Sequence, residues 1–200
     1  MLKLILLVMK KIFLIVVALG LFSMSSFAQS EISVGYCSSD LYFHNIYRDY
    51  NDYRTPYGGF YLSFTSDVSN LGNWFTLRSG LAYSAGSSEI DGEIDRESYL
   101  TIPLDFRLRT PGSTHFYVSF GPHFSYGLSS TVTKGGRTED VYETCDYKRY
   151  DVMLATNCGL VLSGGLCFQI GIEGGMVTRM VTDDARMSRN AVTLGIGYSF

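Results

Sequence analysis

The sequence AVTLGIGYSF, residues 191–200, alternates without a break between large apolar side chains and small or polar ones. The large group consists of Val192, Leu194, Ile196, Tyr198 and Phe200. Because successive side chains of a β-strand point to opposite faces, a period of two gathers the large group on one face. We therefore predict a strand with one apolar face and one face of small and polar groups.

The same alternation recurs seven times upstream of this strand. The segments are 32–36, 60–65, 75–84, 100–109, 115–126, 152–162 and 166–173. In each, one side is almost purely aliphatic and aromatic, whereas the other is rich in Gly, Ser, Thr and isolated charges. Eight such segments predict eight strands within residues 29–200, which leaves no room for a second domain.

The connections between these segments alternate in length. Short turns are expected at Ser69–Asn73, Thr110–Thr114 and Leu162–Gly165, and long polar connections near 42–56, 86–97, 129–147 and 181–190. Short turns on one side and long loops on the other, with an even strand count, are the pattern of a transmembrane β-barrel. The prediction is an all-β, eight-stranded antiparallel up-and-down transmembrane barrel with both chain ends on the short-turn side.

Two other folds give related patterns. A soluble β-sandwich or lipocalin-like barrel also alternates, but its apolar side chains point inward, and small side chains would not line its solvent face. Residues Val152–Ile172 carry no charge, so hydropathy alone would suit a membrane-spanning helix. Gly164-Gly165 and the alternation on both sides of this pair favour a hairpin instead.

The first 28 residues have the pattern of a cleaved signal peptide. Lys10 and Lys11 precede an uninterrupted apolar stretch, Ile12–Phe22, and Ser26-Phe27-Ala28 offers small side chains at a cleavage site. The chain would start naturally at Met1 or at Met9. We expect export of residues 29–200 across the inner membrane.

Composition excludes several classes of protein. Charged residues make up 18% of the chain, below the roughly 25% of a typical soluble domain. Residues 1–28 contain three lysines and no acidic residue, so removing them lowers the formal charge from −3 to −6. An acidic protein gains nothing electrostatically from nucleic acid, and we expect no nucleic-acid partner.

Tyr99-Leu100-Thr101-Ile102-Pro103-Leu104, the terminal Gly197–Phe200 and the signal peptide resemble the small outer-membrane β-barrel proteins of Bacteroidota, often labelled PorT-like or outer membrane protein β-barrel domain. The resemblance implies an outer-membrane location, periplasmic chain ends and contact with lipid and lipopolysaccharide. It also implies insertion by the barrel-assembly machinery through Phe200. It implies no activity, so we expect a non-enzymatic barrel whose loops serve recognition of a protein or surface ligand, adhesion or envelope stability.

Charged residues share the face that a barrel turns toward its lumen. They are Arg78, Asp105, Arg107, Arg109, Glu173 and Arg179. Burying them singly would cost several kcal/mol each, so they should pair inside the barrel. An eight-stranded barrel is just wide enough for side chains to fill, which favours an ion-paired plug over the alternative of a narrow channel.

Two clusters of residues could have a chemical role, as a metal site or a catalytic site, instead of a purely structural one. Glu89, Asp91, Glu93, Asp95 and Glu97 alternate in the second long connection. They would suit Ca²⁺ or Mg²⁺, but a solvated acidic loop without metal is the expectation. His44 with Ser87 or Ser88 and Asp91 would suit the alternative of a lipid-modifying enzyme of the acyltransferase type.

The other two histidines, His115 and His123, are expected to fill space and form hydrogen bonds. We assign no catalytic, metal-binding or cofactor-binding residue. Cys37, Cys145, Cys158 and Cys167 are expected to be free thiols, since Cys158 and Cys167 fall on opposite faces of one hairpin. A bridge between Cys37 and Cys145 would require the loop to bend inward.

The first long connection, Tyr42–Tyr57, is rich in tyrosine and contains arginine. This composition is typical of protein-binding surfaces. It is equally typical of the aromatic girdle that anchors a barrel at the membrane interface.

Overall fold

The computed structural model describes residues 29–45, 57–72, 74–90, 92–145, 147–181 and 185–200. The predicted signal peptide and most of the Tyr42–Tyr57 connection lie outside the described residues. Within the described part, no helix is long and apolar enough to cross a membrane. The segment Val152–Ile172, for which a spanning helix was the alternative, forms two strands and a turn.

The strands and one short helix follow each other along the chain. They are β1 (Ser30–Asn45), β2 (Tyr57–Asn70), β3 (Phe75–Ile90), β4 (Glu93–Arg109), β5 (His115–Lys134), β6 (Arg137–Asp140), α2 (Val141–Thr144), β7 (Tyr150–Val161), β8 (Leu166–Gly175), β9 (Met180–Val181) and β10 (Ala185–Ser199).

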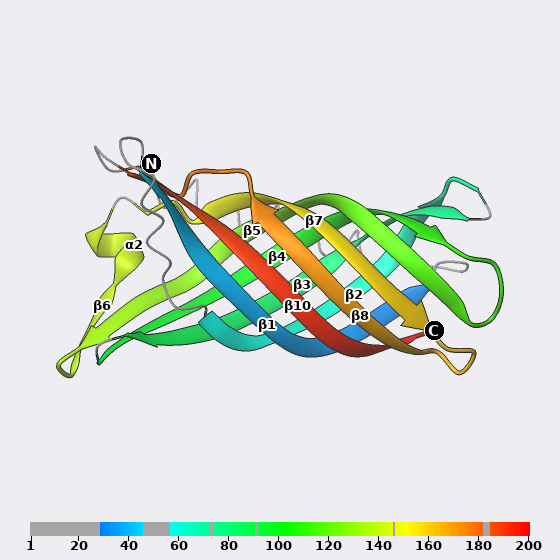
Figure 1. The fold of residues 1–200 in the computed structure, drawn as a ribbon, viewed down its shortest axis with the longest axis horizontal. Coiled ribbons are helices and arrows are strands. Elements are labelled where there is room, and N and C mark those ends of the chain that lie inside the picture. Colours follow the sequence, from blue (N-terminus) through cyan, green and yellow to red (C-terminus); the bar gives the residue numbers. More distant parts are fainter. Residues whose placement is uncertain (1–28, 46–56, 73, 91, 146, 182–184) are drawn as a thin grey trace, which may run out of the picture.

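Eight of these strands form a closed antiparallel barrel (Figure 1). Chain neighbours pair in the order β1, β2, β3, β4, β5, β7, β8 and β10, and β10 then pairs with β1 from Glu31↔Ser199 to Asn45↔Ala185. The short strands β6 and β9 extend the sheet by pairing with β5 and β10. The predicted eight-stranded up-and-down topology is confirmed.

The short connections lie together at one end of the barrel, called here the short-turn end. They comprise residues 71–74, 110–114 and 162–165. Ser30 and Phe200 close this end, each donating its amide hydrogen to the other's carbonyl, at 2.9 and 2.8 Å. Gly165 has a positive φ of 86°, and a side chain there would meet the Ser199 carbonyl, so this turn requires glycine.

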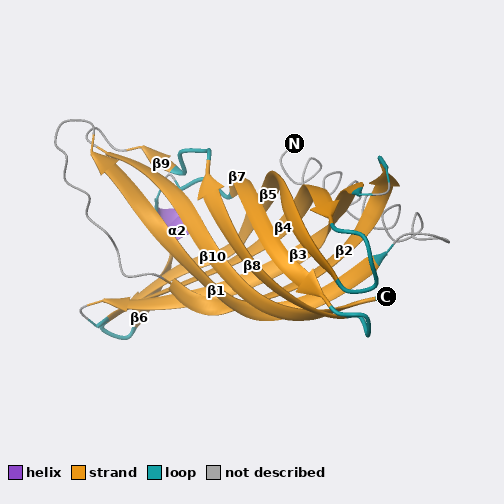
Figure 2. Cartoon of the chain, turned by 45° about the vertical axis from the view of Figure 1, so that its right-hand side comes forward, coloured by secondary structure: helices purple, strands orange, loops and turns teal. Residues whose placement is uncertain are grey.

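The opposite end, called here the extended end, differs from the sequence prediction. Residues 86–97 and 129–147 were expected to be long polar connections, but β3, β4, β5 and β6 continue through most of them. The β5–β6 hairpin turns at Gly135-Gly136, and both glycines have a positive φ. A two-residue turn needs this backbone conformation to match the right-handed twist of the two strands that it joins. Figure 2 shows β6 and α2 at this end, far from the C-terminus.

The apolar side chains of the wall point outward, as predicted for a membrane barrel and opposite to a soluble one. On β5, every second residue from Phe116 to Tyr126 except Pro122 is an exposed large apolar group. These 11 residues match the length of about 9–11 that a tilted strand needs to cross a bilayer. Exposed aromatic residues mark both ends of this belt: Tyr36 and Tyr126 toward the extended end, Trp74 and Phe200 toward the short-turn end.

The core of the protein is polar. Glu31, Arg78, Asp151 and Arg179 are among its most completely buried side chains. All four cysteines are free; Cys37 and Cys167 face the lumen, whereas Cys158 is exposed on the outer face of β7. The predicted opposite placement of Cys158 and Cys167 is therefore confirmed.

Candidate functional site

The lumen is the candidate functional site, and its polar side chains form three layers. Glu31 is the centre of the layer nearest the short-turn end. Its Oε2 accepts hydrogen bonds from both Arg78 and Arg107, each at 3.0 Å. Arg78 also pairs through Nε with Asp67 at 3.0 Å. One charge-balanced cluster therefore ties together β1, β2, β3 and β4.

Two tyrosine rings, one from β2 and one from β5, and Gln169 of β8 support this layer. The Arg107 guanidinium lies 3.7 Å from the centre of the Tyr117 ring. The Tyr117 hydroxyl donates to Gln169 at 2.9 Å, and Gln169 donates to the Tyr61 hydroxyl at 2.7 Å. The Tyr61 hydroxyl lies against Gly195, where a Cβ would clash with it, so the glycine provides the space for the ring.

His123 forms the middle layer. Its Nδ1 lies 2.9 Å from Glu173 and its Nε2 lies 3.3 Å from Asp105. Only the protonated ring can donate from both nitrogens, so this geometry is that of an imidazolium between two carboxylates. His123 thus links β5 to β4 and β8, as the hydrogen-bonding role predicted for it requires.

The third layer lies toward the extended end and corrects the prediction of a solvated acidic loop. Asp95 and Glu97 are both only 6% exposed. The Glu97 carboxylate accepts hydrogen bonds from Tyr99, from Tyr147 at 3.1 Å and from Ser130 at 3.3 Å. Asp95 and Glu97 lie two residues apart on the lumen face of β4. Tyrosine hydroxyls supply the hydrogen bonds that water would give to these carboxylates in an open loop.

Tyr57 and Tyr147 complete the surroundings of these acids. The Tyr57 hydroxyl donates to Asp95 at 3.0 Å, so this ring belongs to the lumen rather than to the girdle or a binding loop. Burial and the Glu97 carboxylate raise the pKa of Tyr147 well above its usual value. Tyr147 therefore remains a neutral donor at physiological pH.

Arg179 closes the third layer and was expected to pair with a lumen charge. Instead its guanidinium donates to the hydroxyls of Tyr99 and Tyr142, the latter at 3.1 Å, and to the Lys148 carbonyl at 3.2 Å. It also lies 4.3 Å from the centre of the Tyr147 ring. Tyrosine faces attract cations, which explains how a fully buried guanidinium is held here.

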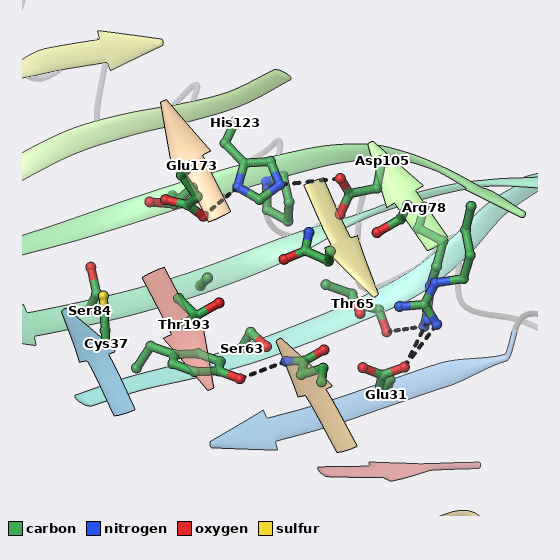
Figure 3. A pocket seen from close by; sticks show the side chains of 18 of the residues that line it. Glu31, Cys37, Ser63, Thr65, Arg78, Ser84, Asp105, His123, Glu173 and Thr193 are labelled. Carbon is green, nitrogen blue, oxygen red and sulfur yellow. Dashed lines mark hydrogen bonds and ion pairs between the residues drawn. The ribbon is translucent and has the colours of Figure 1, made fainter. Parts of the chain in front are cut away.

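A small cavity remains between the layers (Figure 3). Its volume is about 80 Å³, and its walls include Glu31, Asp105, His123, Glu173 and Arg189. A cavity of this size and polarity holds a few water molecules rather than an organic ligand. Arg189 reaches only 3.9 Å from Glu173, and two of its nitrogens have no hydrogen-bond partner among the described residues.

The remaining predicted residues are not brought together. The side chain of His44 and residue Asp91 lie outside the described part, Ser87 is exposed and Ser88 is buried. Glu89 is exposed, and Glu93 pairs with Lys134 at 3.3 Å. Within the described ranges, no group of His, Cys, Asp and Glu could hold a metal ion.

Two further residues fall at the short-turn end. His115 is buried there, at the start of β5, and Arg109 donates to the Gln29 side chain at 2.6 Å. Sequence reasoning did not single out Glu31, although the alternation that turns Ile32 and Val34 outward already placed it on the lumen face. Tyr142 and Tyr147 carried no such signal, because they lie outside any alternating segment.

A closed barrel with an apolar belt, aromatic residues at both edges of the belt and a charged interior defines an outer-membrane β-barrel. The family model for the outer membrane protein beta-barrel domain matches residues 15–178. The chain belongs to this family and is located in the outer membrane. No curated protein matches it.

Several solved barrels have a similar architecture. Neisserial surface protein A is 9% identical, with a TM-score of 0.50, over 88% of this chain and 100% of that one. Ail, the attachment invasion locus protein of Yersinia pestis, is 18% identical, with a TM-score of 0.48, over 88% and 100%. OprG of Pseudomonas aeruginosa is 10% identical, with a TM-score of 0.48, over 86% and 96%. At such identities, the likeness to Neisserial surface protein A concerns the fold alone.

Proposed function

We propose that this barrel is a non-enzymatic protein that uses its extended end for recognition, adhesion or stabilisation of the envelope. The observation that supports this is the rim of paired strands beyond the belt. On β5, residues 127–134 continue the strand past Tyr126, and β6 returns along them. Paired strands of this kind form a scaffold, and binding residues are commonly placed at the end of such a scaffold.

The orientation follows from the same proposal. Residues 1–28 direct export, the short-turn end faces the periplasm, and the extended end faces outward among lipopolysaccharide. Phe200 is the feature that the barrel-assembly machinery would recognise. Within the family, the Leu100–Leu104 strand and the terminal aromatic residue support a place among the PorT-like proteins of Bacteroidota.

The described histidines support a non-enzymatic role. Both nitrogens of His123 face carboxylates, so neither is available to activate a serine. His115 lies at the short-turn end, away from the outer rim where a lipid-modifying enzyme would act. For the alternative based on His44, no observation within the described residues adds support.

Truncating the β5–β6 hairpin tests the role of the rim. Replacing residues 133–138 with Asn-Gly joins Val132 to Glu139, which are already paired, through a two-residue turn. We expect this variant to assemble in normal amounts, shown by heat-modifiable migration, but to reduce cell attachment or resistance to bile-salt detergent. The matched control is Gly135→Asn, which keeps the full hairpin and a favourable turn. Unchanged attachment and resistance in the truncated variant would contradict the proposed role of this hairpin.

The layered lumen also leads us to expect no steady conductance. Glu31 and His123 each join strands that are not neighbours in the wall, and Arg179 joins the segment after β8 to Tyr99 of β4. An ion would therefore have to break polar contacts in all three layers. Planar-bilayer recording of the purified protein provides the measurement. Steady open-channel current that changes with Arg107→Ala would show that the lumen is a pore and not a plug.

A further inference from the structure

Two cavities lie in series beneath the extended end. The larger one, of about 80 Å³, lies between the layers, and a second one of about 10 Å³ adjoins it. Cys37, Ser84 and Arg189 line both, so these side chains separate the two spaces. Glu97 and Tyr99 line the smaller cavity, and both belong to the layer that Arg179 closes.

The segment Met176–Arg179 carries this closing residue. It follows β8 and precedes β9, and its exposure falls from 68% at Met176 to 0% at Arg179. The segment therefore starts on the outer surface and inserts one guanidinium into the layer of tyrosines. Arg179 is the only residue in this four-residue stretch that the structure buries.

The segment is held by a few single hydrogen bonds rather than by continuous pairing with a neighbouring strand. Its backbone is fixed by the Met176 amide, which donates to Val152, and by the Arg179 carbonyl, which accepts from the Lys148 amide at 3.0 Å. The Lys148 ammonium donates to the Thr178 carbonyl at 3.1 Å. By contrast, each wall strand is paired along much of its length on both sides. Elements with few contacts open at much lower free energy than the strands around them.

We propose that Met176–Arg179 is a latch that closes the lumen at the extended end, with the Arg179 guanidinium as the group that holds it shut. Releasing the latch opens the two cavities to water and to small hydrophilic solutes from that end. The Glu31 layer below stays closed, so the open state is a cup and not a pore. The extended end thus has two states, one with a covered lumen and one with a polar recess.

Cys37 provides a native reporter of the open state. Its thiol lines both cavities beneath the latch and is 8% exposed. The probe is methyl methanethiosulfonate, a small neutral reagent, applied to the folded protein in lipid vesicles. Mass spectrometry of peptides then gives the modification rate of each cysteine separately. Cys145, which is exposed, reports reagent activity, and Cys167, which is fully buried elsewhere in the lumen, reports global unfolding.

Arg179→Ala is expected to raise the modification rate of Cys37 by about tenfold or more, because each hydrogen bond lost from a charged donor favours opening by about that factor. Cys145 should react at the parental rate and Cys167 should stay protected. The matched control is Arg137→Ala, which removes an exposed arginine from the same end and should leave Cys37 protected.

Arg179→Lys provides a second test if the alanine variant assembles poorly. Lysine keeps the charge but cannot reach three acceptors with a planar group, so an intermediate rate at Cys37 is expected. Equal Cys37 rates in the parent and in a folded Arg179 variant would overturn the latch. Deprotection of Cys37 and Cys167 together would overturn it as well, because the change would then be unfolding of the barrel.

Discussion

Replacing Glu31 with glutamine should destabilise the folded barrel by about 3–5 kcal/mol, the usual cost of removing one partner from a buried ion pair. The carboxylate is 1% exposed and serves two arginines through a single oxygen. Glutamine has the same shape but no charge, so Arg107 would lose its ion-pair partner and Arg78 would keep only Asp67. Urea titration in lipid vesicles, followed by heat-modifiable migration, measures the change.

Glu93→Gln is the matched control for this prediction. Its partner Lys134 has a side chain that is 77% exposed, so the pair is worth at most about 1 kcal/mol. The two variants differ by the same chemical change, one in the lumen and one at the rim. If both shift the urea midpoint equally, the Glu31 cluster does not hold the barrel together.

Replacing Phe200 with alanine should lower the amount of assembled barrel several-fold while leaving export intact. The ring is 65% exposed and stacks on Tyr198 at 6.4 Å, at the edge of the apolar belt. The backbone of the same residue closes the wall on Ser30. An unclosed wall would expose unpaired strand edges to hydrocarbon, each unpaired group costing several kcal/mol by order of magnitude. Pulse-chase fractionation should show the variant accumulating in the periplasm.

Phe116→Ala separates the assembly signal from simple loss of a ring. Phe116 is also 65% exposed, and it lies near the same end on β5. If assembly depends on recognition of the terminal strand, Phe116→Ala should assemble far better than Phe200→Ala. Parental assembly of the Phe200 variant would remove Phe200 as an assembly signal.

The wall could be predicted from sequence because lipid and lumen impose opposite demands on alternate residues. Val192 and Leu194 face hydrocarbon, whereas Thr193 and Gly195 face a crowded interior. The contrast between an apolar outer face and a polar inner face is confined to the part of each strand that crosses the membrane. Beyond Leu128, residues 129–134 are polar except Val132, so the strand continues without any alternation that the sequence could reveal.

The partners within the lumen could not be predicted in the same way. The alternation along β3 and β4 predicted that Arg78 and Arg107 point into the lumen and need an acidic partner, and the structure confirms this. Which acid pairs with these arginines depends on how far β1, β3 and β4 are shifted relative to one another along the barrel axis. The alternation of residues carries no information about this shift. Arg179 shows the same limit, since its partners are tyrosines from three separate segments.

The distribution of the Glu31 cluster bears on the order in which the barrel folds. Glu31, Asp67, Arg78 and Arg107 come from the first four strands, and together their formal charges cancel. The charges of this cluster are thus balanced within the first four strands, without any residue of the later ones. The His123 layer needs β4, β5 and β8, and so it forms only when the second half curls over the first. We therefore expect the Glu31 cluster to form before the His123 layer, and the pairing of β1 with β10 to follow both.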